Sequence, residues 1–134
     1  MLTISINRGL NQPVYEQIAD QVRLLVSSGA LAPGTALPSV RRLAGDFGVN
    51  LNTIARAYRL LEDEGFLTIR HRAGAMVASP ADEVDPDSRA ELLDQLRTTL
   101  ARLRQAGIAT GELVQLVQDE VFAMRGRVRE TQNE

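Results

Sequence analysis

Cysteine is absent from this 134-residue sequence, and histidine occurs once, as His71. Without thiols the chain can form neither a disulfide nor a thiolate metal site, and one imidazole cannot build a histidine metal cluster. The acids Glu62, Asp63 and Glu64 are consecutive in a helical pattern, so their carboxylates point in different directions. No catalytic constellation is visible. We therefore expect no metal, no cofactor and no enzymatic activity.

Long apolar runs are also missing. No apolar stretch approaches 18 residues, and no basic segment followed by an apolar run opens the chain. These absences predict a soluble, cytoplasmic protein with no membrane partner. Aromatic residues make up only 4% of the sequence, although 44% hydrophobic residues are enough for a core. The length suits one ordinary domain, or a small domain with an appendage.

Lysine is absent too, so all fifteen basic residues are arginines. The net charge is −2, which by itself argues against a nucleic-acid partner. The charge is unevenly distributed, however, with a balance of +2 over residues 1–78 and −4 over residues 79–134. This asymmetry weakly favours DNA binding by the first part of the chain.

Residues 37–65 indicate two short amphipathic helices that meet at a tight turn. The first helix has apolar residues at helical spacing, and Gly48 then breaks the pattern. Asn50 is a plausible N-cap for the second helix. These features are typical of a helix-turn-helix. The apolar positions are Val40, Leu43, Ala44 and Phe47 in the first helix, and Ile54, Ala57, Tyr58 and Leu61 in the second.

The second helix also has a polar face, formed by Asn52, Thr53, Arg56 and Arg59. Asn, Thr and Arg side chains hydrogen-bond base edges and phosphates in a DNA major groove. The same pattern would suit the solvated face of an ordinary core helix, so the flanking sequence has to decide between the two interpretations.

The flanking segments add a strand, a helix and a hairpin. Alternation over residues 1–6 predicts a short strand, and helical periodicity follows Pro13 to about Ser28. After Gly65 the period changes to that of two strands. The tip between them is rich in arginine, as in a minor-groove or phosphate probe, or as in an ordinary exposed turn. A hairpin placed directly after a helix-turn-helix favours a winged helix.

The sequence over residues 13–78 resembles the winged-helix domain of the GntR family of bacterial transcription regulators. The matching segments are PVYEQIADQVR and GALAPGTALPSVRRLAGDFGVNLNTIARAYRLLEDEGFLTIRHRAGAMV. The Gln-Pro-Val-Tyr opening and the Gly-Val-Asn-x-Asn-Thr run resemble the YtrA subfamily in particular. MocR-type regulators share this segment but append a large aminotransferase-like domain, for which this sequence has no room.

The resemblance implies a set of DNA-contacting residues. Relatives often carry arginine where this chain has Leu51 or Ala55, which shifts the expected base contacts to Asn52 and Arg56. The wing usually carries two glycines, whereas here Arg72 fills the first glycine position. Together with the polar face, the resemblance predicts DNA binding by Arg41, Asn50, Asn52, Thr53, Arg56, Arg59, His71, Arg72 and Gly74.

Residues 79–86 predict an acidic linker, and residues 87–134 predict a tail of two amphipathic helices. Two such helices cannot bury their apolar stripes alone. We expect them to pack on the winged-helix core and on the same hairpin of a second chain. Folding back on the chain's own domain is the alternative. The predicted dimerisation residues are Leu92, Leu96, Leu100, Leu103, Leu113, Val117, Val121 and Met124.

The sequence thus predicts a mainly α-helical fold with a small β-hairpin: a winged helix-turn-helix over residues 1–78 and a helical dimerisation tail. The expected function is that of a homodimeric transcription regulator that binds an inverted-repeat operator, with recognition helices about 34 Å apart. By resemblance it would repress its own operon, with transporter genes among the targets. Any small-molecule effector would bind at the dimer interface. The alternative function is a winged-helix protein-interaction module that does not read DNA.

Overall fold

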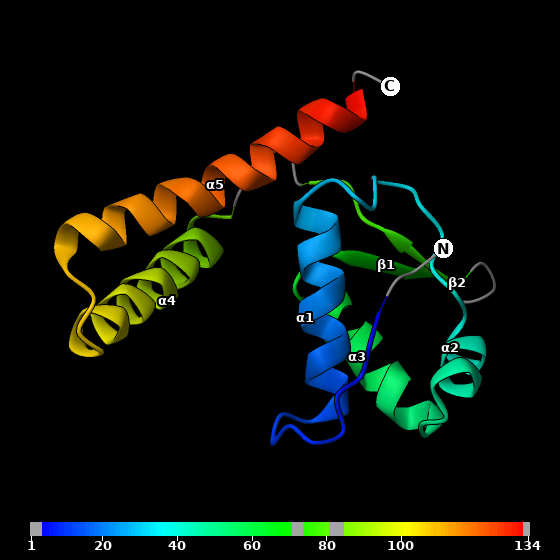
Figure 1. Ribbon diagram of the computed structural model, residues 1–134. Coiled ribbons are helices and arrows are strands. Elements are labelled where there is room, and N and C mark those ends of the chain that lie inside the picture. Colours follow the sequence, from blue (N-terminus) through cyan, green and yellow to red (C-terminus); the bar gives the residue numbers. More distant parts are fainter. Residues whose placement is uncertain (1–3, 71–73, 81–84, 133–134) are drawn as a thin grey trace.

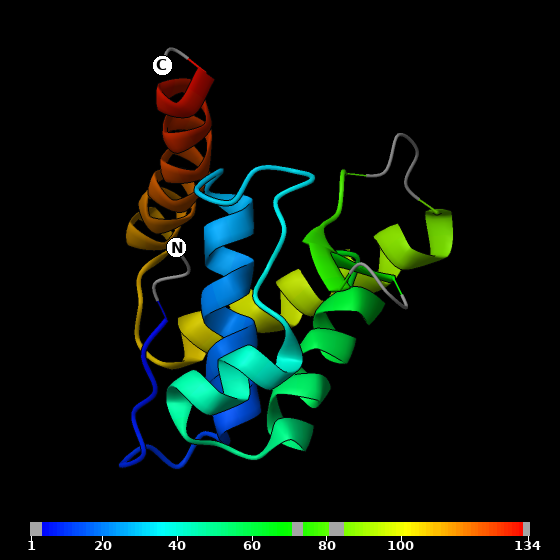
Figure 2. The same ribbon diagram turned by 90° about the vertical axis from the view of Figure 1, so that its right-hand side faces the viewer.

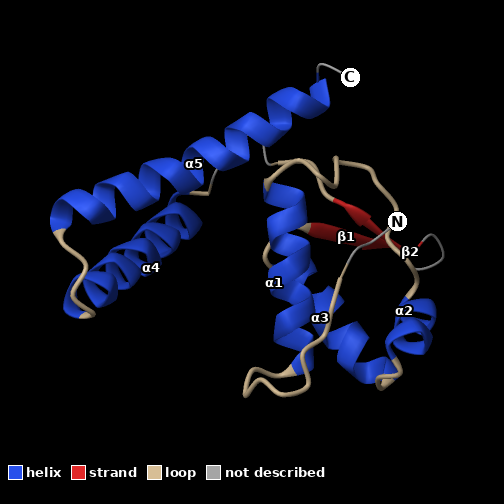
Figure 3. Ribbon diagram, viewed as in Figure 1, coloured by secondary structure: helices blue, strands red, loops and turns tan. Residues whose placement is uncertain are grey.

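The computed structural model describes residues 4–70, 74–80 and 85–132 (Figure 1). Within these ranges the chain forms five helices and one antiparallel two-stranded sheet (Figure 3), which confirms the predicted fold class. In chain order the elements are α1 (Val14–Ser27), α2 (Val40–Phe47), α3 (Leu51–Asp63), β1 (Leu67–Arg70), β2 (Gly74–Val77), α4 (Pro86–Gln105) and α5 (Thr110–Gln132).

A single apolar core joins α1, α2, α3 and the hairpin. Helix α3 lies at its centre, because it packs against α1, α2 and β1. The spacing of apolar residues on α3 puts four side chains on one face, and all four are buried. The largest fully buried side chains of this core are Tyr58, Ile18, Ile54, Leu61, Val22 and Val77.

The ends of α2 and α3 follow local chemistry. The Ser39 hydroxyl accepts a hydrogen bond from the Arg42 backbone N–H, which caps α2. Gly48 ends α2 with φ 63° and ψ 37°, a left-handed conformation that glycine adopts without steric cost. The Asn50 side chain accepts from the Asn52 N–H at 2.8 Å and starts α3. These caps fix the tight turn that the sequence predicted.

The two strands form the wing, with Leu67 paired to Val77 and Arg70 paired to Gly74. The sheet is anchored to the loop before α2. The Gly34 N–H donates to the Val77 carbonyl at 2.8 Å, and Ala36 forms an isolated bridge with Met76. The sequence did not predict this third edge, because the loop residues have no strand pattern of their own.

The strand predicted near the amino terminus is wrong for residues 4–6, and residues 1–3 lie outside the described part. Two glutamines on α1 act in place of a neighbouring strand. The Gln21 side-chain amide accepts a hydrogen bond from the Ser5 N–H at 2.9 Å and donates one to the Ser5 carbonyl at 2.6 Å. One turn earlier, the buried Gln17 does the same for Asn7. Side chains therefore satisfy the extended backbone.

Helices α4 and α5 form an antiparallel hairpin on the side of α1 away from α2 and the wing (Figures 1 and 2). Asp85 caps α4, with Pro86 in its first turn. The hairpin packs on itself, and its contacts with the winged helix are marginal among the described residues, contrary to the expected docking on the core. Of the helices that the structure describes, none is long and apolar enough to cross a membrane.

The predicted dimerisation residues divide into two groups. Leu113 is buried, and Leu100 and Leu103 are half-buried, near the turn that joins α4 and α5. The remaining five are exposed: Leu92, Leu96, Val117, Val121 and Met124. Among these predicted residues, those that the hairpin covers therefore lie at its closed end.

Candidate nucleic-acid interface

Helix α3 presents a polar face on the side opposite its buried residues. Asn52, Arg56 and Arg59 are exposed, whereas Ile54 and Leu61 on the core side are fully buried. Figure 2 looks onto the side of the molecule where α2, α3 and the wing lie, and the tail hairpin does not cover α3 there. We call Asn52, Arg56 and Arg59 the polar face of α3.

The other two predicted DNA-contacting residues at the start of α3 are less available to a ligand than the polar face. Thr53 is half-buried, and it lies toward the flank of the helix rather than on the polar face. The Asn50 side-chain oxygen already accepts the capping hydrogen bond from Asn52. Among the described residues none accepts a hydrogen bond from its NH₂ group, so Asn50 can donate to an external acceptor without opening the cap.

Arg56 contacts the first turn of α1. Its guanidinium carbon lies 3.9 Å from the centroid of the Tyr15 ring, a cation–π contact. Among the residues that the structure describes, no carboxylate lies within 4.0 Å of Arg41, Arg56 or Arg59. These three arginines therefore keep their charge available to an outside anion.

Helix α2 contributes a second pair of arginines. Arg41 is exposed, and Arg42 lies 4.0 Å from Asp46 one turn later. Both side chains of that pair are more than 60% exposed, so the contact contributes little to stability. Positive charge thus lies on the first helix of the helix-turn-helix as well as on the second.

In the wing, the end of β1 and the start of β2 pair with each other next to the tip. Gly74 is exposed and has φ 77°, a left-handed conformation, and it pairs with the exposed Arg70. The predicted contact residues His71 and Arg72 fall outside the described residues. The part of the predicted site that can be followed thus comprises α2, α3 and the two strand ends next to the tip of the wing.

Two residues that support the helix-turn-helix and the polar face of α3, Arg8 and Tyr15, were not predicted from the sequence. The Arg8 guanidinium donates to the Phe47 carbonyl at 3.0 Å and to the Gly48 carbonyl at 3.4 Å, so it fastens the amino-terminal segment to the turn of the helix-turn-helix. Tyr15 supplies the ring beneath Arg56. Tyr15 belongs to the Pro-Val-Tyr segment that carried the family resemblance, and this was the one available signal.

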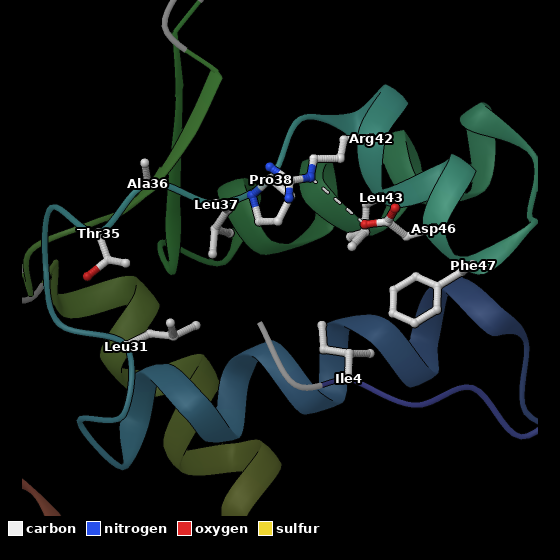
Figure 4. A pocket seen from close by; sticks show the side chains of 10 residues that line it. All are labelled: Ile4, Leu31, Thr35, Ala36, Leu37, Pro38, Arg42, Leu43, Asp46 and Phe47. Atoms are coloured by element: carbon white, nitrogen blue, oxygen red, sulfur yellow. Dashed lines mark ion pairs between the residues drawn. The ribbon is translucent and has the colours of Figure 1, made fainter. Parts of the chain in front are cut away.

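A cavity of about 800 Å³ lies behind α2, between the amino-terminal segment and the loop that follows α1 (Figure 4). Most of its lining is apolar, and the Arg42–Asp46 pair stands at its α2 side. It lies within the winged helix, so it is distinct from the effector position expected at the dimer interface. The lining residues are Ile4, Leu31, Thr35, Ala36, Leu37, Pro38, Arg42, Leu43, Asp46 and Phe47.

Comparison with known proteins gives a consistent result. Residues 14–77 match the family described as bacterial regulatory proteins, gntR family. The chain is 30% identical to the HTH-type transcriptional repressor YtrA of Bacillus subtilis, over 92% of this chain and 95% of that protein. It is 44% identical to the HTH-type transcriptional regulator Rv1152 of Mycobacterium tuberculosis, over 58% of this chain and 62% of that protein.

Solved structures agree with this match. A protein described as a transcriptional antiterminator from Listeria monocytogenes superposes with a TM-score of 0.76, at 29% identity and over 90% of each chain. YtrA from Sulfolobus acidocaldarius superposes with a TM-score of 0.59 at 38% identity. The match covers 73% of this chain and 97% of that chain. AraR(DBD) in complex with operator ORX1 superposes with a TM-score of 0.50 at 26% identity. The match covers 57% of this chain and 96% of that chain.

Proposed function

The chain belongs to the GntR family of bacterial DNA-binding transcription regulators, not to a family of enzymes, and we propose that it is a homodimeric repressor that binds an inverted-repeat operator. In this proposal the repressor acts in the cytoplasm on its own operon. Transporter genes are among the proposed targets, by resemblance to the YtrA subfamily. DNA-binding transcription regulation follows from membership of the family.

The observation that carries DNA reading is the polar face of α3. Its three side chains are exposed, and its two arginines lack a described carboxylate partner. Asparagine and arginine are suited to base edges, and an unpaired arginine can exchange its counterions for phosphates. A structural neighbour, AraR(DBD), is described in complex with an operator, which supports the same use of the fold here.

The exposed apolar side chains of the tail support a homodimer. Apolar side chains that a single hairpin leaves in water are stabilised when a second copy covers them. On α4, Leu92 is 61% exposed and Leu96 is 48% exposed. On α5, Val121 is 59% exposed and Phe122 is 74% exposed. Two-fold pairing through this surface would give one operator half-site to each winged helix, with half-sites about one DNA turn apart.

Footprinting on the DNA upstream of the protein's own gene tests the operator. The proposal predicts one protected region with two related half-sites about 10 base pairs apart, centre to centre. A reporter driven by the same region should be less active when the protein is present. Protection of a single half-site would contradict the homodimer, and raised reporter activity would contradict repression. Absence of protection would favour a protein-interaction module instead.

A further inference from the structure

The contact between Tyr15 and Arg56 joins the first turn of α1 to the middle of α3. The guanidinium carbon lies 3.9 Å above the ring centroid. Helices α1 and α3 pack against each other, and the half-buried ring of Tyr15 packs against the core below it. Its hydroxyl donates to the Glu16 carboxylate at 3.1 Å. The ring is therefore a firm support for a long and otherwise flexible side chain.

Stacking leaves the polar atoms of Arg56 free. An aromatic ring covers one flat side of a guanidinium, whereas the five N–H groups point outward in its plane. Among the described residues, none accepts a hydrogen bond from this guanidinium and no carboxylate lies within 4.0 Å of it. The donors thus remain unused in the free protein, although the side chain has a defined position.

An arginine that is ordered before binding loses less conformational freedom when it reaches a phosphate or a base. We propose that Tyr15 is a positioning residue for DNA binding: its ring holds the Arg56 guanidinium on the polar face of α3, with the donors directed at DNA. Tyr15 itself touches no nucleic acid in this scheme. The inference rests on the proposed function, and it adds a residue from α1 to the machinery of the recognition helix.

The test is a double-mutant cycle on DNA affinity. The probe is a fluorescein-labelled duplex from upstream of the protein's own gene, titrated with wild type, Tyr15→Leu, Tyr15→Phe, Arg56→Ala and the Tyr15→Leu/Arg56→Ala double variant. An exposed cation–π contact contributes about 0.5–1 kcal/mol, so Tyr15→Leu should weaken binding about two- to fivefold. Tyr15→Phe keeps the ring and should bind like wild type. In the Arg56→Ala background, Tyr15→Leu should have no further effect.

Two further readouts separate positioning from general structure. Thermal unfolding checks that Tyr15→Leu is folded, and NMR follows the Arg56 side-chain protons. These protons should be shifted upfield by the ring current in the wild type and in Tyr15→Phe, and should move downfield in Tyr15→Leu.

The outcomes are distinguishable. Equal weakening by Tyr15→Leu with and without Arg56 would overturn the inference, because the effect would not pass through the arginine. Tighter binding by Tyr15→Leu would also overturn it, since the ring would then withhold Arg56 from DNA. In both cases the wild type still binds, and the proposed function stands. A wild type that binds the duplex no better than scrambled DNA would overturn both.

Discussion

The hydroxyl of Tyr58, on α3, donates a hydrogen bond of 2.6 Å to the backbone carbonyl of Pro38, just before α2. Tyr58 is 2% exposed, and it is the largest fully buried side chain of the core. The bond joins α3 to the residue that precedes the N-cap of α2, and so ties the two helices together.

Replacing Tyr58 by phenylalanine should destabilise the fold. The change removes one donor and leaves the Pro38 carbonyl without its partner, which costs about 1–3 kcal/mol. Urea denaturation of Tyr58→Phe should show this loss in the free energy of unfolding. Tyr15→Phe is the matched control, because its hydroxyl bonds the side chain of Glu16 rather than a backbone carbonyl of the core. The control should stay within about 0.5 kcal/mol of wild type.

The same residue makes stability depend on alkaline pH. Burial raises the pKa of Tyr58 from 10.0 to about 12, because the ionised phenolate is poorly solvated in the core. A pKa that is higher in the folded state means that the stabilisation is complete below pH 10 and is lost as the pH rises toward 12. The loss in the free energy of unfolding should be on the order of 3 kcal/mol.

The sequence has neither lysine nor cysteine, so few other side chains ordinarily titrate in this window. Denaturation at several pH values between 9 and 12 measures the effect. Tyr58→Phe should flatten the decline, and a decline of unchanged steepness in that variant would assign the effect to another group.

Gly45 inside α2 and Gly48 at its C-cap should respond in opposite directions to alanine. Gly48 has φ 63°, where a Cβ is strained, so Gly48→Ala should lower the free energy of unfolding by about 1–2 kcal/mol. Gly45 lies within the helix, and a Cβ there would meet nothing within 4 Å. Gly45→Ala should therefore raise stability by up to about 1 kcal/mol. Equal effects of the two changes on the melting temperature would contradict the left-handed assignment at Gly48.

A charge placed on the exposed stripe of α4 should separate the proposed dimer. Leu96 is 48% exposed in a single chain, so Leu96→Glu should leave the winged helix folded. Sedimentation should give twice 14.7 kDa for the wild type and 14.7 kDa for the variant. Thr98→Glu adds the same charge on the other side of the helix and should remain dimeric. A monomeric wild type would refute the dimer.

The elements that could be predicted from the sequence are those with a local cause. The apolar spacing of Ile54, Tyr58 and Leu61 defines the buried side of α3, and Gly48 defines the turn before it. The polar face follows from the same periodicity. Local pattern therefore predicted the helix-turn-helix, the wing and the helices of the tail.

The features that were missed depend on partners distant in the chain. The bonds from Arg8 to the end of α2 span about forty residues. The extended residues near Ser5 and Asn7 look like a strand by alternation, yet glutamine side chains of α1 satisfy them. The stacking of Arg56 on Tyr15 requires the packing of α1 on α3, which no local pattern states. All three features therefore depend on tertiary contacts and not on local sequence.

The most direct test of DNA reading by the polar face of α3 is the ratio of two affinities. Fluorescence anisotropy would compare DNA from upstream of the protein's own gene with a scrambled duplex, for wild type, Asn52→Ala and Arg97→Ala. Arg97 is an exposed arginine of α4, paired with Asp94, and serves as the control. We predict that the wild type prefers its own upstream DNA by about a thousandfold or more. Asn52→Ala should reduce that preference by about 1–3 kcal/mol, and Arg97→Ala should leave it unchanged. Equal affinity of the wild type for both duplexes, or an Asn52→Ala variant as selective as the wild type, would contradict the account.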